Sequence, residues 1–386
     1  MSGAERCRRS FISTPRGMRT EQPGQLQSLT PLRGIAALWV VLYHYASQYL
    51  PALHADRYTH LLDKGYLAVD LFFMLSGFVL THVYWRVFTE PVRGSYGRFL
   101  LARVARLYPL HLFVLSLFIA TALASRAVEY AATGTFEKVA IEGSQSVTAL
   151  VANLFMLQGL KASELSWNYP AWSISVEFIA YLGFPLALPV IWRARPSRKI
   201  VLAAFLVAVL AGLAGITDDD FDQWDGPLTL LRCVPEFLLG SLLYAVFIGR
   251  WWRSFLGRDA ILVAITIVLL LLLHLGGSDF LVILLFPMLI LAAVANQGRA
   301  AALLNIAPLV WLGEISYSLY LIHGLVQFVT TQLLDATGYD SRDDLSTTAS
   351  LAIMIVMLVA SFLCGSYGHH SVEKAGRQRL RLMFGA

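Results

Sequence analysis

Residues 29–46 read LTPLRGIAALWVVLYHYA, a run that is apolar at most of its positions. Together with the few residues that follow, it is long enough to cross a hydrocarbon core of about 30 Å as an α-helix. Arg33 stands near its start, and His44 follows eleven residues later, ~16 Å further along a helix axis. We therefore predict a membrane-spanning helix with a basic end and a histidine near the bilayer centre.

The rest of the chain has the same apolar character. Of its 386 residues 57% are hydrophobic and only 14% are charged, with a mean hydropathy of +0.62, which is far more apolar than a soluble protein. The sequence predicts an all-α fold, a polytopic transmembrane helical bundle of about ten spans. The spans are expected at about 32–50, 66–85, 107–124, 171–191, 200–216, 227–248, 260–275, 280–296, 307–333 and 347–368.

The charges are distributed unevenly between the two sides that these spans define. Most of the 30 Lys and Arg fall on the side that also holds both termini, whereas the acidic runs 218–225 and 335–344 fall on the other. The positive-inside rule makes the basic side cytoplasmic. We therefore expect a multi-pass protein of the bacterial inner (cytoplasmic) membrane with both termini cytoplasmic.

A further apolar piece, 148–160, is too short to cross the membrane. Counting it as a span would place the basic run 193–199 outside, so we interpret it as an interfacial or re-entrant segment. The chain is expected to comprise a basic cytoplasmic segment (1–28), one membrane domain (29–370) and a basic cytoplasmic tail (371–386).

Ionisable side chains inside a bilayer are costly and are by default candidates for a functional site. His44 is the strongest, because a neutral imidazole is well suited to take a proton from a hydroxyl near pH 7. The alternative is a histidine that packs between helices through hydrogen bonds. Glu177 follows, about six residues into its span, where a carboxylate must be paired or protonated. It could orient an imidazole, bind acceptor hydroxyls or bridge two helices.

The second span carries Asp70 near its outer end and the pair Ser76 and Gly77 midway. Small residues of this kind favour a close helix crossing over a site. Asp70 could cap the helix or bind a polar group. Asp70 and Ser76 remain possible acceptor or cavity residues.

Arg103 and Arg106 lie three residues apart, on one face of a helix that we expect to end before Pro109. Guanidinium groups at this spacing suit a polyphosphate such as that of coenzyme A. The alternative is charge that only sets topology and attracts anionic lipid headgroups.

Two later spans add further polar side chains. Arg232 and Glu236 have the spacing of a pair that neutralises itself along one helix. Ser316, Tyr320 and His323 form one polar stripe, which could line a cavity or join helices through hydrogen bonds. The sequence contains no zinc-protease motif or Gly-rich phosphate loop, so no metal site is predicted.

Taken together and in order, these motifs resemble the bacterial integral-membrane acyltransferase 3 family, over about residues 28–370. Members of this family O-acylate surface polysaccharides, lipopolysaccharide, peptidoglycan and some macrolides. The segments that carry the resemblance are LRGIAAL (32–38), VDLFFMLSGFVL (69–80), RFLLARVARLYP (98–109), WSISVE (172–177) and SYSLYLIH (316–323).

The resemblance implies that His44 is the catalytic base, that Glu177 is functionally important, and that Arg33, Arg103 and Arg106 serve the acyl donor. Three departures from the family pattern put the donor contacts and any role of His323 in doubt. They are Thr30 and Pro31 in place of an Asp-Gly pair, Ala102 in place of a second Arg, and Gly324 and Leu325 where a Pro is common.

The expected reaction moves an acyl group, acetyl in the first instance, from cytoplasmic acyl-CoA to a hydroxyl of a saccharide or glycan acceptor. Acyl-CoA is a co-substrate here, and no bound cofactor is expected. The expected partners are the lipid bilayer, acyl-CoA and the acceptor, with a separate extracytoplasmic acceptor protein possible and no nucleic acid. The alternative is a transporter or flippase of a lipid-linked saccharide that uses the same central polar residues.

Overall fold

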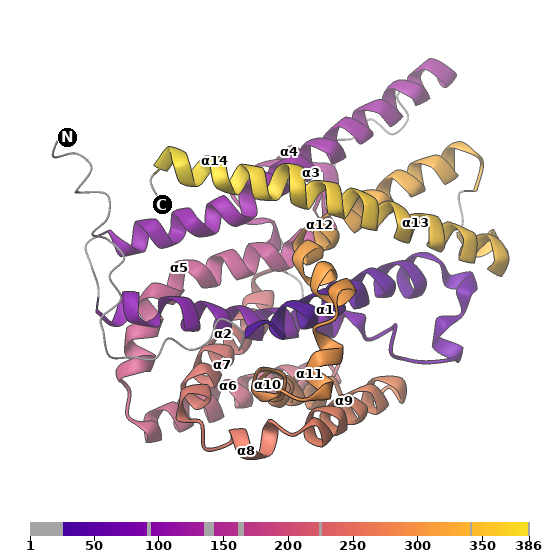
Figure 1. Ribbon diagram of the computed structural model, residues 1–386. Coiled ribbons are helices and arrows are strands. Elements are labelled where there is room, and N and C mark those ends of the chain that lie inside the picture. Colours follow the sequence, from indigo (N-terminus) through magenta and orange to yellow (C-terminus); the bar gives the residue numbers. More distant parts are fainter. Residues whose placement is uncertain are drawn as a thin grey trace.

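The computed structural model describes residues 26–90, 94–134, 143–160, 166–223, 226–339 and 342–384, and this part of the chain is helical, without strands. Each of the ten predicted spans corresponds to a helix (Figure 1). The first is α1 (Leu29–Leu42), continued by the π-helical segment η2 (Tyr43–Tyr49). The others are α2 (Ala68–Thr89), α3 (Ser95–Thr133), α5 (Trp172–Arg193), α6 (Pro196–Ile216), α7 (Thr229–Gly249), α9 (Asp259–His274), α10 (Asp279–Ala295), α12 (Ala307–Ala336) and α13 (Thr347–Tyr367).

Seven of the described helical segments are long and apolar enough to cross a membrane, namely those containing α2, α3, α5, α6, α7, α12 and α13. The apolar helices α9 and α10 are shorter, with 16 and 17 residues. The chain is thus a multi-pass membrane protein with an all-helical bundle.

Shorter helices connect or extend the spans. They are α4 (Val147–Leu154), α8 (Arg253–Leu256), α11 (Arg299–Leu304) and α14 (Ala375–Phe384). With eight residues, α4 confirms that the piece 148–160 contains no full span. The boundary predicted at residue 370 falls within a second π-helical segment, η12 (Gly368–Lys374), which leads from α13 directly into α14.

Helix α3 corrects one prediction. It was expected to end before Pro109, but it runs through this proline for 39 residues. Membrane helices tolerate proline. Next to Pro109 the Tyr317 hydroxyl of α12 donates to the Leu107 carbonyl at 2.7 Å, which ties α3 to α12. In Figure 1 the C-terminal end of α3 projects beyond the other helices.

Two glycine contacts bring the central helices together. On α2 and α7, a Cβ at Gly77 would overlap the Phe237 carbonyl, and a Cβ at Gly240 would overlap that of Met74. On α1 and α12, Gly34 and Gly313 allow a similar approach. The packing expected of Gly77 is thus confirmed, and these contacts hold α2 against α7 and α1 against α12.

Candidate functional site

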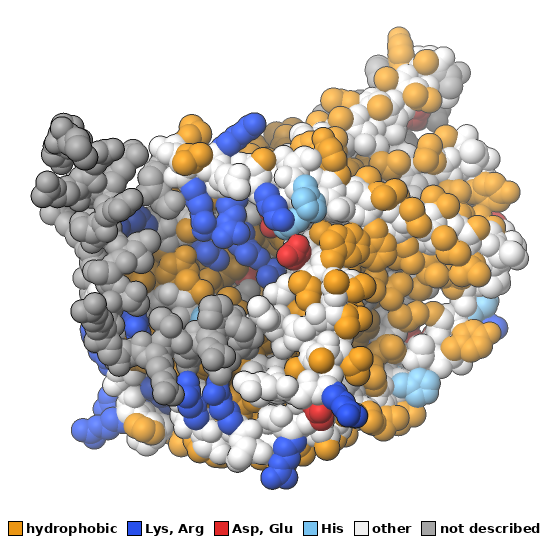
Figure 2. Space-filling model, in the orientation of Figure 1, with side chains coloured by type: hydrophobic (Ala, Val, Ile, Leu, Met, Phe, Trp, Pro, Cys, Tyr) orange, Lys and Arg blue, Asp and Glu red, His pale blue; other side chains and the backbone are white. Residues whose placement is uncertain are grey.

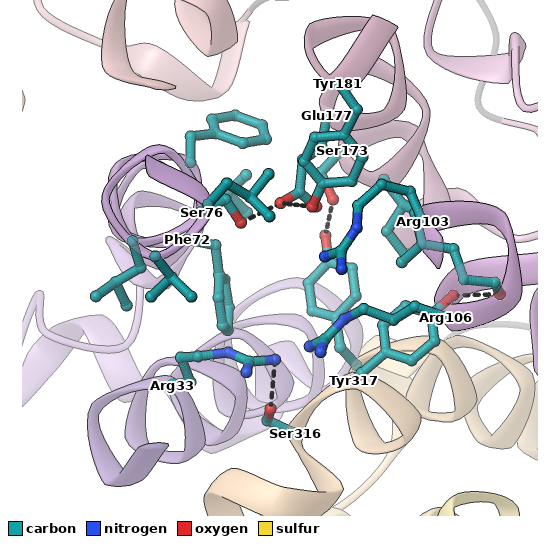
Figure 3. Close-up of a pocket in the computed structure, with 18 residues that line it drawn as sticks. Arg33, Phe72, Ser76, Arg103, Arg106, Ser173, Glu177, Tyr181, Ser316 and Tyr317 are labelled. Carbon is teal, nitrogen blue, oxygen red and sulfur yellow. Dashed lines mark hydrogen bonds between the residues drawn. The ribbon is translucent and has the colours of Figure 1, made fainter. Parts of the chain in front are cut away.

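A cavity of about 120 Å³ lies where α1, α2, α3, α5 and α12 meet. Seven residues singled out from the sequence line it: Arg33, Ser76, Arg103, Arg106, Glu177, Ser316 and Tyr320. Figure 3 shows the guanidinium groups of the three arginines facing the same space as the Glu177 carboxylate. These seven lining residues come from five different helices, so the fold assembles what the sequence separates.

Glu177 is held by two hydroxyl groups within this cavity. Ser76 donates to its Oε1 from α2, and Tyr181, one turn further along α5, donates to the same oxygen at 2.5 Å. Hydrogen bonds to an ionised acceptor are stronger than those between neutral groups. The side chain therefore bridges two helices while it remains partly accessible from the cavity.

The arginines are anchored more loosely. Arg33 Nη2 lies 3.5 Å from Ser316 Oγ on α12. Arg103 Nη2 donates to the Tyr84 hydroxyl at 3.3 Å, and its guanidinium carbon lies 5.6 Å from the centre of that ring. Both side chains are half-buried. A group of guanidinium ions with weak protein contacts is suited to an anionic ligand with several phosphate oxygens.

His44 and His323 form a pair beside this cavity. His44 lies at the start of the π-helical segment η2, and π-helical turns are frequent at functional sites. Its Nδ1 is 3.0 Å from the Val40 carbonyl oxygen and 3.2 Å from His323 Nε2. A carbonyl can only accept, so Nδ1 of His44 carries the proton. Its Nε2 is then the basic nitrogen.

Aromatic rings enclose the imidazole. The ring centres of Tyr43 and Tyr169 each lie 4.8 Å from that of His44. His44 itself is partly exposed, whereas His323 is fully buried. The histidine is therefore neither sealed among aliphatic side chains nor freely solvated.

Tyr320 separates the histidine pair from the cavity. Its side chain lines the cavity, and its ring centre is 5.7 Å from that of His323. The Tyr320 hydroxyl donates to the Pro170 carbonyl at 2.9 Å and lies 2.7 Å from Ser173 Oγ. Neither histidine lines the cavity itself. The Tyr320 ring therefore lies between the cavity and His323.

Asp70 is not brought to this site. It is fully buried and accepts from Arg232 Nε and Nη2, both at 2.7 Å. Arg232 also donates to the Phe221 carbonyl at 2.6 Å. The predicted pairing of Arg232 with Glu236 is corrected: the direct ion pair of Arg232 is with Asp70 on α2, and Glu236 acts on Arg232 only electrostatically. The sequence alone could not locate Asp70 as the partner. Asp70 joins α2 to α7 and does not line the cavity.

Sequence reasoning missed two residues of the site. Tyr181 follows Glu177 by one helical turn, a spacing that could have signalled their contact. Ser173 carried no signal, because its role depends on Tyr320 of a distant helix. Among the described residues, no group of three or more His, Cys, Asp and Glu side chains could hold a metal ion.

Comparison with known proteins gives one family. The sequence model described as an acyltransferase domain matches residues 26–366. The residues that line the cavity and the histidine pair all fall within this match. No solved structure matches the chain.

Three relatives illustrate the similarity. Acyltransferase MdmB of Streptomyces mycarofaciens is 28% identical over 90% of this chain and 91% of its own length. Protein 2 in picA locus of Rhizobium radiobacter is 32% identical over 51% of this chain and 99% of its own length. O-acetyltransferase OatA of Staphylococcus aureus is 26% identical over 78% of this chain, and the match spans only 50% of that relative.

Proposed function

We propose, proceeding from the fact that this chain belongs to the acyltransferase 3 family, that it transfers an acyl group from acyl-CoA to a hydroxyl of a saccharide-type acceptor. The chain is a multi-pass membrane acyltransferase. The proposed donor and catalytic base rest above all on one observation: a histidine with a fixed tautomer adjoins a cavity lined by three arginines.

The proposed donor is acyl-CoA, with acetyl-CoA as the first candidate. Its phosphates would bind Arg33, Arg103 and Arg106, whose guanidinium groups match phosphate oxygens in charge and geometry. The name of O-acetyltransferase OatA supports an acetyl group. In this proposal the basic face is cytoplasmic and the protein lies in the bacterial inner membrane, in agreement with the distribution of Lys and Arg.

The proposed reaction uses His44 as the general base. Its Nε2 removes the proton of the acceptor hydroxyl while the oxygen attacks the thioester carbonyl. The carbon–sulfur bond then breaks, and the CoA thiolate takes the proton from His44, which restores the neutral imidazole. During the protonated stage, Nδ1–H still faces the Val40 carbonyl and His323 Nε2, at 3.0 and 3.2 Å. These acceptors orient the ring and stabilise its positive charge, so His323 acts as a positioning residue.

Thiol release tests this proposal. Purified protein is given acetyl-CoA and a membrane glycan fraction, and free CoA and acetylated glycan are measured together. We expect His44→Ala and His44→Gln to lower transfer by about 10²–10⁴-fold, the usual contribution of a general base. His274→Gln is the matched control, because His274 is an exposed histidine at the end of α9. Near-normal transfer by both His44 variants would refute the assignment.

The same assay distinguishes the proposed acyltransferase from a transporter or flippase. A transporter would consume no thioester, so adding acceptor would release no thiol. The enzyme transfers the acyl group either directly to the saccharide or first to a separate extracytoplasmic acceptor protein. Comparing a soluble saccharide with washed membranes as the acceptor source distinguishes these two routes.

A further inference from the structure

The C-terminal helix α14 lies along α3, and the two run in opposite directions (Figure 1). Their contact is fixed at one point, where a Cβ on Gly376 would come within 2.5 Å of Pro109 Cβ. From this point α14 runs back towards the start of α3. Its arginines therefore pass beside those of α3 that line the cavity.

Whereas Arg379 is exposed, Arg377 and Arg381 lie on the half-buried face of α14. They are separated by one helical turn, ~6 Å, which is close to the ~4.5 Å between Arg106 and Arg103 along α3. Arg377 interacts electrostatically with Arg381, Arg106 and Arg103. Figure 2 shows Lys and Arg side chains gathered at the edge of a hollow, in the region of α3 and α14.

The charges in this region do not balance. Two carboxylates accompany the five guanidinium groups of Arg33, Arg103, Arg106, Arg377 and Arg381. Glu177 and Glu373 both attract Arg33, and Glu373 also attracts Arg377. Glu373 is already engaged by His369 and Ser318. The buried Nε atoms of Arg103 and Arg381 have no hydrogen-bond acceptor within the described chain. Like charges repel when they are held together in this way, so the cluster is complete only with an anion.

We propose that Arg377 and Arg381 extend the donor site, so that α14 and α3 together clamp the phosphates of the acyl donor at the mouth of the cavity. This inference rests on the proposed function. A phosphomonoester alone carries about −1.5 to −2 charges at neutral pH, and a diphosphate adds more. A nucleotide that carries a phosphomonoester and a diphosphate has enough negative charge to balance the excess of guanidinium groups. Its acyl arm can then extend past Arg106 towards Tyr320.

Direct binding of CoA tests this inference without turnover. Affinities for CoA and for dephospho-CoA, which lacks the 3′-phosphate, are measured in neutral detergent with the double variant Arg377→Gln/Arg381→Gln. Arg379→Gln is the matched control, because Arg379 is exposed on another face of the same helix and its loss changes the net charge alone. Thermal melting of each variant verifies that it is folded.

We expect the double variant to bind CoA at least tenfold more weakly, with Arg379→Gln close to wild type, since each charged hydrogen bond is worth about tenfold. In transfer assays the KM for acyl-CoA should rise while kcat at saturating donor is kept. Unchanged CoA affinity, or an equal loss in Arg379→Gln, overturns the inference. So does a double variant that loses binding of phosphatidylglycerol in nanodiscs but keeps CoA affinity, because the cluster is then a lipid site.

The two proposals fail in different ways. If the double variant binds CoA normally and His44→Ala abolishes transfer, only the role of α14 is wrong. If wild-type protein neither binds CoA nor releases thiol from it, the donor assignment itself is wrong.

Discussion

Tyr320 lies between the two parts of the site, the arginine-lined cavity and the histidine pair. It lines the arginine-bearing cavity on one side and approaches His323 on the other. Its hydroxyl is held by Pro170 and Ser173, so the ring has a defined position. In the proposed function, an acyl arm that enters from the arginine-lined cavity would reach His44 beside this ring.

Enlarging this ring should therefore separate binding from transfer. We expect Tyr320→Trp to lower kcat for acyl transfer about tenfold or more while CoA affinity stays unchanged, because the proposed phosphate site at the arginines lies on the cavity side of the ring. Tyr320→Phe is the control: it keeps the ring and loses the hydroxyl contacts, at a stability cost of about 1–2 kcal/mol. Wild-type turnover by the tryptophan variant would show that the acyl arm takes another route.

Glu177 offers a second test, of the charge balance within the cavity. Glu177→Gln keeps an oxygen for the Ser76 and Tyr181 hydroxyls but removes a negative charge from among the arginines. We expect it to fold normally and to bind CoA at least as tightly as wild type. Glu177→Ala should melt at a lower temperature, because the two hydroxyls lose their acceptor, at about 1–3 kcal/mol. Weaker CoA binding by the glutamine variant would indicate that the charge itself supports the donor.

The helices themselves could be predicted from apolar length, because about 20 residues must be apolar to cross the membrane. The π-helical segment η2 and the passage of α3 through Pro109 could not, since apolar length does not specify local backbone geometry. The same holds within the site. Glu177 could be chosen as a costly charge in an apolar segment, and Arg103 by its spacing from Arg106. The meeting of His44 with His323, 279 residues away, required the fold.

The crossing of α2 and α7 leads to a prediction about helix packing. We expect Gly77→Ala and Gly240→Ala each to destabilise the bundle by about 1–3 kcal/mol, because the added methyl overlaps a backbone carbonyl of the facing helix. Gly183→Ala on α5 is the matched control, since nothing lies within 4 Å of a Cβ there. Thermal melting in detergent measures all three. Equal melting temperatures would mean that the helices separate readily at this crossing.

The ion pair between the same two helices should behave differently from the glycines. Asp70→Ala leaves the Arg232 guanidinium buried without its carboxylate, so we expect a loss of about 3–5 kcal/mol. Removing both charges, with Arg232→Met as the second change, should restore part of the loss. CoA affinity of the folded fraction should be unaffected, because Asp70 does not line the cavity. A double variant less stable than Asp70→Ala would contradict this account.

The orientation of the protein in the membrane can be tested by labelling cysteines on its two sides. In a background without native cysteines, Arg57→Cys and Arg379→Cys are labelled with a membrane-impermeant maleimide in intact cells. The positive-inside rule predicts labelling at residue 57 without permeabilisation and at residue 379 only after it. The reverse pattern would place the arginine cluster, and with it the proposed donor site, on the outer side.

The length of α3 has a consequence for everything that approaches the protein from the far side. Its 39 residues extend for about 58 Å, almost twice the thickness of a hydrocarbon core. A bilayer that covers the arginine-bearing start of this helix cannot also cover its last turns. These turns therefore lie beyond the hydrocarbon core, on the side opposite to the arginines, where the end of α3 projects past the other helices (Figure 1).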